Sequence, residues 1–428
     1  MIFDNKTIRN ILWLSIDKVF LLIGGLVVSV VVAKHLGATE LGKISFGLSL
    51  SGLAVTLSQW GASHYIFNES AKDPQNGERL IRNSESFRLS VYIVTWLVIS
   101  VWLFLSEKYN DSYLLISLVI LSNLFLGLDV YQFYFNALLK SKVNAIGSMY
   151  SKTISMSLRL LLAVFSYSTY FFIIPILLNN VILYSYKRLK LKANKVKELE
   201  YKKSFIKEGT PYMMTAMCVY SYMKINEILL VQMIDYTSLG KYIVGLTLAQ
   251  SWAFVPMSIG ISLLSKPIKE NKSSVSGFSF VLLSMILFSL PILSFTYFFP
   301  HLILSYTFGS EYNQVGDILF LLCVSSLLSS LVFINNRIIG SMPNGGRYLF
   351  KKGVLSAFFA IPISYILILY YGVKGAALAL IIIEILNFTI FNYLFNNKII
   401  LKIQLNCLNI PDYFSEMRCL LSRGSSDI

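Results

Sequence analysis

The chain has 428 residues, of which 55% are hydrophobic and only 14% are charged, and its mean hydropathy is +0.64. A water-soluble chain usually carries about 25% charged residues. The composition therefore excludes an ordinary soluble globular protein and points to an integral membrane protein. The formal net charge is +15, but no basic segment is interleaved with aromatic residues, so we expect no nucleic acid partner.

Apolar runs that are long enough to cross a bilayer recur along the whole chain. A helix of about 20 residues spans the ~30 Å hydrocarbon core. We expect about twelve such spans, at 11–33, 44–67, 89–106, 113–138, 150–167, 169–186, 210–234, 242–264, 277–299, 315–340, 353–371 and 375–396. The first span precedes no small-residue cleavage site, and we interpret it as a retained helix rather than a signal peptide. The fold class that we expect is an all-α integral membrane protein.

The distribution of Lys and Arg indicates how the spans are oriented. If both termini lie in the cytoplasm, only five of the 37 Lys and Arg residues fall in outside loops, and most of the others lie in cytoplasmic segments. Cytoplasmic loops of membrane proteins carry such an excess. The strongest basic run, at 186–208, separates the sixth and seventh spans. We interpret it as a cytoplasmic linker near anionic lipid head groups, with a specific binding partner as the alternative.

A sequence repeat divides the chain into two halves. The segments ELGKISFGLSL (40–50) and SLGKYIVGLTL (238–248) are identical at six of eleven positions, at an offset of 198 residues. Because each half has an even number of spans, both halves enter the membrane in the same orientation. This predicts a pseudo-two-fold axis along the membrane normal. We expect a six-helix bundle at 1–186, a linker at 187–208, a second six-helix bundle at 209–397 and a cytoplasmic tail at 398–428.

Four segments carry a family resemblance. They are LGATELGKISFGLSLSGL, LGKYIVGLTLAQSWAFVPMSIGISLLSKP, FGSEYNQVGDILFLL and YGVKGAALALII. Together they resemble polysaccharide-biosynthesis flippases of the Wzx type, which belong to the MATE-like multidrug, oligosaccharidyl-lipid and polysaccharide exporter superfamily. The similarity runs over most of the chain, up to the end of the last span.

The resemblance implies twelve helices in two bundles in the bacterial inner membrane. It also implies a substrate, an undecaprenyl-diphosphate-linked oligosaccharide repeat unit such as that of lipopolysaccharide O-antigen, which is moved from the cytoplasmic to the periplasmic leaflet. Polymerase and chain-length machinery are the protein partners that the resemblance suggests.

A diphosphate head group needs cationic partners in a polar cavity, because unpaired polar groups are costly in hydrocarbon. Lys18, Arg159 and Lys224 lie in the first, fifth and seventh spans. At ~1.5 Å per residue, Lys224 lies ~20 Å from the cytoplasmic end, near the midplane, and the other two lie nearer ~10 Å. Lys224 and Glu227 share one helix face, so they form either a cavity-lining pair or a bridge that only holds helices together. For Arg159 and for Lys18, which follows Asp17, snorkelling toward the interface is the alternative.

Asp129 and Glu384 are further acids within or at the ends of spans. A buried carboxylate there binds a proton or sodium ion and couples transport to its gradient, or it pairs with a cation on another helix, which we favour for Glu384. Gln59, Asn123 and Gln250 suit a path for sugars, with interhelical hydrogen bonding as the alternative. We expect no metal site and no other cofactor.

Two rival functions remain open. A membrane-embedded glycan polymerase or transferase would place reactive residues in a large outer loop or a His/Asp cluster, but the outside loops are short and the chain has three histidines. No P-loop is present, so we do not expect an enzyme. A cation-coupled multidrug exporter of the same fold is the nearer rival, although three cations within spans favour an anionic lipid.

Overall fold

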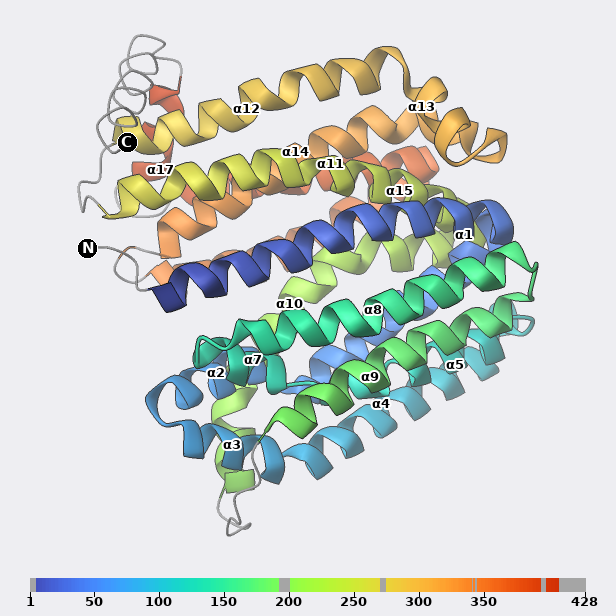
Figure 1. Cartoon of the computed structure of the whole chain (residues 1–428). Coiled ribbons are helices and arrows are strands. Elements are labelled where there is room, and N and C mark those ends of the chain that lie inside the picture. Colours follow the sequence, from blue (N-terminus) through green and yellow to red (C-terminus); the bar gives the residue numbers. More distant parts are fainter. Residues whose placement is uncertain are drawn as a thin grey trace. The chain divides into compact units, whose positions relative to one another are not determined.

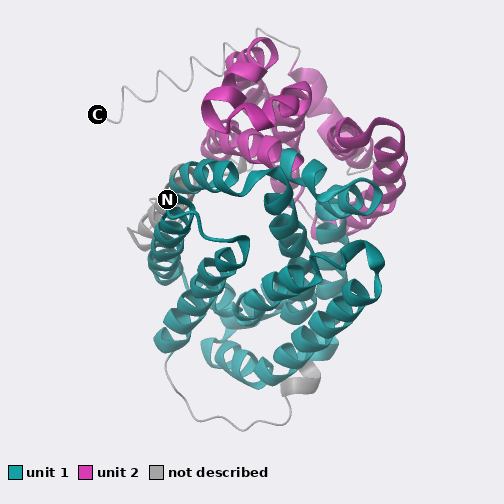
Figure 2. Ribbon diagram, turned by 90° about the vertical axis from the view of Figure 1, so that its right-hand side faces the viewer, with its two compact units in different colours: residues 1–241 teal, residues 242–428 magenta. Residues whose placement is uncertain are grey.

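The computed structural model describes residues 5–191, 201–269, 275–340, 342, 345–393 and 398–407, and all secondary structure within them is helical. Side chains are described from residue 24 onward, except at 201–204 and 265–269. The chain forms two compact units, Met1–Lys241 and Tyr242–Ile428 (Figure 2). The expected all-α fold class is confirmed for this described part of the chain.

Unit 1 contains the first ten α-helices (Figure 1). They are α1 (Asn5–Gln59), α2 (Ala62–Lys72), α3 (Pro74–Asn83), α4 (Glu85–Leu105), α5 (Tyr113–Ser122), α6 (Leu124–Leu128), α7 (Tyr131–Ala137), α8 (Ser141–Val164), α9 (Ile173–Lys190) and α10 (Tyr201–Met233), with 3₁₀ turns η1 (Glu107–Tyr109) and η2 (Thr169–Phe172). Helix α11 (Tyr236–Lys269) starts in unit 1 and continues into unit 2.

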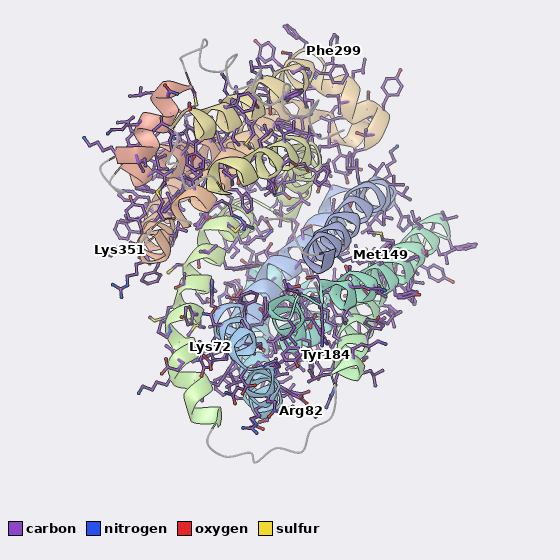
Figure 3. All side chains as sticks on the ribbon, turned by 60° about the vertical axis from the view of Figure 1, so that its left-hand side comes forward. Lys72, Arg82, Met149, Tyr184, Phe299 and Lys351 are labelled. Atoms are coloured by element: carbon purple, nitrogen blue, oxygen red, sulfur yellow. The ribbon has the colours of Figure 1, made fainter. Side chains whose placement is uncertain are left out.

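Unit 2 contains the remaining helices. They are α12 (Val275–Phe298), α13 (Pro300–Thr307), η3 (Ser310–Val315), α14 (Gly316–Gly340), α15 (Gly345–Phe388), α16 (Ile390–Tyr393) and α17 (Ile399–Asn406). Figure 3 shows the side chains of both units, with Lys351 labelled on α15 and Lys72 and Arg82 labelled on α2 and α3.

The helices fit a multi-pass membrane protein. In the described residues, eight helical stretches are long and apolar enough to cross a membrane, and two of them, Gly24–Lys72 and Gly345–Tyr393, have 49 residues each. Gly37 (φ 70°) in α1 and Gly372 (φ 56°) in α15 leave the helical conformation and divide these long helices into two segments. Glycine adopts positive φ without the steric cost that a Cβ brings. Each expected span overlaps a described helix, while the count of about twelve and the two-bundle arrangement stay predictions.

Helix α1 is at the centre of unit 1. It packs against α4, α5, α6, α8 and α10, and α8 also packs along α9. On one side of this unit, the short amphipathic helices α2 and α3 fold onto α7, where Ile66, Ile81 and Tyr131 are buried in a common apolar cluster. Asp73 begins α3 by accepting a hydrogen bond from the backbone N–H of Gln75 (2.9 Å), as an N-cap residue does.

The core of unit 2 joins α12, α14 and α17. Met285 of α12 and Ile334 of α14 have no exposed surface, and neither do Ile400 and Ile403 of α17. The segment expected as a cytoplasmic tail, 398–428, therefore begins with a helix that packs into the core. Its apolar residues are too few to form a span, so the sequence alone predicts only a polar tail here. Residues 408–428 lie outside the described part.

The division of the chain also differs in detail from the expected one. The compact units divide after Lys241, and α10, which we assigned to the second bundle, packs along α1 in unit 1. Helix α10 begins at Tyr201, so the end of the expected linker (187–208) is helical, and residues 192–200 of that linker lie outside the described part. The bundle limits derived from the repeat stay a prediction, because they describe sequence symmetry rather than packing.

Candidate functional site

Helix α10 lies against the second segment of α1, and small residues on α1 allow the two helices to approach closely. A Cβ on Gly52 would collide with the hydroxyl of Tyr220, and one on Gly61, which lies just after α1 at the start of α2, would collide with the backbone of Gly209. Residue numbers rise along α1 as they fall along α10, so the two segments are antiparallel. Interfaces between membrane helices are rich in small residues because backbones then pack closely.

Lys224 and Glu227 lie in the middle of this interface and form the expected pair. Lys224 Nζ is 2.5 Å from Glu227 Oε1, but the two side chains differ in exposure, at 36% for Lys224 and 4% for Glu227. The carboxylate is thus buried, and the partly exposed ammonium has three donors, of which Glu227 accepts one.

The position of Glu227 is fixed from α1. Ser49 Oγ donates a hydrogen bond to Glu227 Oε2, and Tyr220 of α10 donates to the carbonyl oxygen of Ser49 (2.6 Å). Both carboxylate oxygens therefore have partners, one on each helix. A buried charge is tolerated when it is paired and hydrogen-bonded, so the sequence can keep Glu227 inside and hold Lys224 at a defined place.

Arg159 is the second cation of the candidate site. It lies on α8, three residues after Met156, whose sulfur would be 3.3 Å from a Cβ on Gly24 of α1. Its side chain is partly exposed, and it makes no hydrogen bond or ion pair with the described residues. Both α8 and α10 pack against α1. Unit 1 therefore carries a guanidinium that has no partner among the described residues and a half-exposed ammonium, on two helices that pack against the same central helix.

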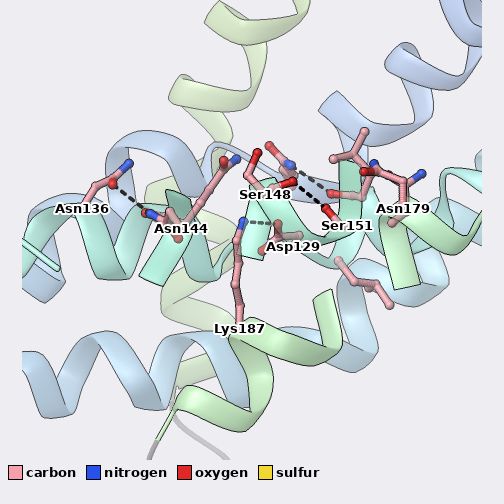
Figure 4. Close-up of polar contacts among 12 residues, drawn as sticks. Asp129, Asn136, Asn144, Ser148, Ser151, Asn179 and Lys187 are labelled. Atoms are coloured by element: carbon pink, nitrogen blue, oxygen red, sulfur yellow. Dashed lines mark hydrogen bonds and ion pairs between the residues drawn. The ribbon is translucent and has the colours of Figure 1, made fainter. Parts of the chain in front are cut away.

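Asp129, by contrast, is neutralised within unit 1. Lys187 Nζ of α9 lies 2.5 Å from Asp129 Oδ2, and both side chains are almost completely buried (Figure 4). Of the two roles that we left open for Asp129, the structure shows the charge partner. Sequence reasoning missed Lys187 because we assigned it to the cytoplasmic linker, one residue beyond the sixth span.

The expected fourth span is broken at Asn123 and at Asp129, and polar side chains donate additional hydrogen bonds to carbonyl groups beside the second break. Gln59 Nε2 donates to the carbonyl of Leu126 (3.2 Å), and Arg88 Nη1 donates to that of Leu128 (2.7 Å). Backbone groups must be satisfied internally in a membrane protein. Gln59 therefore has the structural role that we kept as the alternative to sugar binding.

Asn123 also has a structural role. Its amide nitrogen donates to the carbonyl of Val119 (2.9 Å), and its amide oxygen accepts from Asn180 of α9 (3.1 Å). Gln250, on the part of α11 that belongs to unit 2, is exposed and makes no hydrogen bond with the described residues. Its role in a path for sugars stays a prediction. The side chains of Asp17 and Lys18 lie outside the described residues, although their backbone is part of α1.

Glu384 lies in the second segment of α15, and its negative charge attracts the ammonium of Lys352 in the first segment. Lys352 was missed as a membrane cation, because we placed it in the cytoplasmic loop before the eleventh span. In the described residues, no group of three or more His, Cys, Asp and Glu side chains is arranged to hold a metal ion.

Comparisons with known proteins place this geometry in context. A family model described as "Polysaccharide biosynthesis protein" matches residues 7–260, which is more than half of the chain and includes α8 and α10. Among curated proteins, no sequence matches.

Solved structures match over nearly the whole chain. The lipid II flippase MurJ, in an inward closed conformation, matches with a TM-score of 0.70 and 17% identity, over 93% of this chain and 91% of that chain. An inward-facing multidrug resistance MATE family transporter of the MOP superfamily matches with a TM-score of 0.59 and 14% identity, over 89% and 97%. A MOP superfamily transporter from Pyrococcus furiosus matches with a TM-score of 0.55 and 12% identity, over 90% and 94%. At these identities the likeness shows a shared fold.

Proposed function

Because the chain belongs to the polysaccharide biosynthesis protein family, we propose that it is a flippase for an undecaprenyl-diphosphate-linked oligosaccharide repeat unit, such as that of O-antigen. It moves this lipid from the cytoplasmic to the periplasmic leaflet of the bacterial inner membrane by alternating access, with both termini in the cytoplasm. The likeness of its fold to that of a lipid II flippase supports this proposal. The observation that best supports an anionic, diphosphate-linked substrate is the partly exposed ammonium of Lys224, which is paired with the buried carboxylate of Glu227.

A diphosphate competes with Glu227 for the Lys224 ammonium. Glu227 keeps its hydrogen bond from Ser49 when the lysine turns away, so the carboxylate is not left without a partner. This hydrogen bond offsets part of the cost of releasing Lys224, so the ammonium can exchange between Glu227 and a phosphate. Such a mobile point charge suits a substrate that has to leave again.

Arg159 supplies the second half of the site. Its planar guanidinium donates two parallel hydrogen bonds to phosphate oxygens, and this geometry distinguishes a phosphate from a halide or a single hydroxyl. Because it has no partner among the described residues, it does not have to break an ion pair to bind the substrate. Coupling to a proton or sodium gradient, and association with polymerase and chain-length proteins, are further parts of the proposal.

The test is leaflet exchange of a fluorescent prenyl-diphosphate oligosaccharide in proteoliposomes. We expect the wild-type protein to exchange the lipid and Lys224→Gln to fail. Arg159→Lys should keep partial exchange, because it retains the charge and loses the bidentate fork. Lys351→Gln, which removes an exposed lysine of α15, is the matched control and should exchange like the wild type.

Two outcomes would contradict the proposal. If Lys224→Gln is folded and exchanges the lipid at the wild-type rate, Lys224 and Glu227 only hold helices together. If the wild type exchanges no diphosphate lipid under any ion gradient but transports cationic drugs, the protein is an exporter of the same fold.

A further inference from the structure

Unit 2 contains a lysine that is buried where membrane proteins rarely tolerate a charge. Lys352, in the first segment of α15, has 4% of its surface exposed. Its ammonium is not in contact with a carboxylate, because no described acid lies within ion-pair distance of it. A charge in this position requires a compensating polar environment.

Two amide oxygens from different helices provide that environment. Lys352 Nζ donates to Asn336 Oδ1 of α14 and to Asn392 Oδ1 of α16, both at 2.8 Å. Asn392 Nδ2 donates to the carbonyl of Phe388 (3.1 Å), which directs the oxygen of this amide to the lysine. Asn392 follows the interruption at Thr389 between α15 and α16, and interrupted helices form cation sites in many transporters.

The surroundings contain more polar groups than the ammonium uses. Asn335, next to Asn336 on α14, is completely buried, and neither its amide oxygen nor its amide nitrogen has a partner among the described residues. Asn387 accepts from Ser356 Oγ (2.6 Å) but leaves its amide nitrogen without a partner. Glu384 adds an acidic group whose charge attracts Lys352. Buried polar groups without partners are rare in native structures.

We propose that the amide oxygens of Asn336 and Asn392 form a site for a monovalent cation and that the ammonium of Lys352 occupies it in place of a metal ion. Uncharged oxygen ligands are the donors that Na⁺ and K⁺ accept, and an ammonium group is close to K⁺ in size. The lysine is attached to the chain, so its amino group occupies this site whatever the salt concentration outside.

This inference is independent of the transported lipid. The wild type needs no metal cation for the stability of unit 2, whereas a variant without the ammonium needs a small cation in its place. The expected gain is a new dependence on Na⁺, K⁺ or methylammonium, which can be measured on the purified full chain without any transport assay.

The experiment compares the thermal unfolding of Lys352→Ala and the wild type in detergent, in choline chloride and in increasing NaCl, KCl or methylammonium chloride. We expect the wild type to have the same Tm in all four salts. Lys352→Ala should unfold at a lower Tm in choline, and at least one of the three smaller cations should raise its Tm in a saturable way. Lys351→Ala, which changes the exposed neighbouring lysine, should behave like the wild type.

Two further variants keep the inference testable. Lys352→Met fills the space with an apolar chain, so its Tm should not respond to these cations. Lys352→Ala combined with Asn336→Asp supplies a carboxylate to hold a metal ion, and should fold in NaCl even if Lys352→Ala alone does not. The inference is overturned if Na⁺, K⁺ and methylammonium raise the Tm of Lys352→Ala, and of Lys352→Ala with Asn336→Asp, no more than choline does. It is also overturned if these cations raise the Tm of Lys352→Met as much as that of Lys352→Ala.

Discussion

The hydroxyl oxygens of Thr39 and Thr237 lie 2.7 Å apart, and the two residues are separated by 198 positions, which is the offset of the sequence repeat. Two nearby glycines, which are also 198 positions apart, make equivalent close contacts. A Cβ on Gly42 would collide with the carbonyl of Tyr236, and one on Gly240 would collide with that of Ala38, in the same reciprocal way. All of these residues belong to unit 1. The two copies of the repeat thus meet at equivalent residues, as the two sides of a two-fold contact do.

A cross-link at this contact should block transport. In the proposed topology both threonines lie at the outer side of the membrane, where the proposed alternating access requires the helices to separate. With the native cysteines replaced, Thr39→Cys with Thr237→Cys should form a disulfide on oxidation, because the hydroxyls already lie within hydrogen-bond distance. We expect lipid exchange in proteoliposomes to stop on oxidation and to return on reduction. Unchanged exchange by a fully cross-linked protein would show that this contact does not open.

Removing the negative charge of Glu227 should change affinity and turnover in opposite directions. In Glu227→Gln the ammonium of Lys224 loses its counter-charge, so a diphosphate binds more tightly and leaves more slowly. Initial rates of lipid exchange should therefore show a lower KM and a lower kcat than those of the wild type. Ser49→Ala keeps the charge and serves as a control, since it should reduce stability more than it changes KM. A raised KM in Glu227→Gln would contradict this role.

Removing one partner of the buried pair of Asp129 and Lys187 should lower the free energy of unfolding more than replacing both partners. Removing one partner of a buried ion pair costs about 3–5 kcal/mol, whereas replacing both with neutral groups is often nearly neutral. We expect Lys187→Met to lower the free energy of unfolding by that amount, and Lys187→Met with Asp129→Asn to recover most of it. Arg188→Met, at the more exposed pair with Glu85, should cost less than ~1 kcal/mol. Equal losses for the single and double variants would argue against the pairing.

The thiol of Cys407 reports on the packing of α17. Burial raises the pKa of this thiol to about 11, and its sulfur lies 3.5 Å from the carbonyl of Ser279 on α12. Because the thiolate is the reactive form, alkylation of a variant that keeps only Cys407 should be slow at pH 8 and become faster as pH rises toward 11. The unfolded protein should react rapidly at pH 8. A folded protein that reacts equally fast at that pH would show that α17 does not pack on α12.

The sequence predicted features that depend on local spacing. Lys224 and Glu227 are three residues apart on an apolar helix, and this spacing was enough to predict their ion pair. The positions of apolar runs predicted the helices, and the quoted segments predicted the family, which the family match confirms. The alternative roles of Gln59 and Asn123 could not be decided, because their partners are carbonyl groups beside helix breaks that no proline marks.

Features that depend on contacts between distant segments could not be predicted in this way. Lys187 and Lys352 both lie at the ends of apolar runs, where the sequence alone predicts a cytoplasmic location. Their burial depends on Asp129, 58 residues away from Lys187, and on Asn392, 40 residues away from Lys352. A lysine that directly follows or precedes an apolar run is the signal that we would now examine for such pairs.

The hydrogen bonds of Arg88 have a consequence for biogenesis. Its guanidinium is completely buried and bonds the carbonyls of Ile81 (2.9 Å) and Leu128 (2.7 Å). The ribosome makes Arg88 forty residues before Leu128, so α4 reaches the membrane with a strong donor whose second acceptor does not yet exist. A guanidinium does not rest in lipid without partners. The bond to Leu128 can therefore form only after α6 has been made, so the final packing of α4 depends on the insertion of α6.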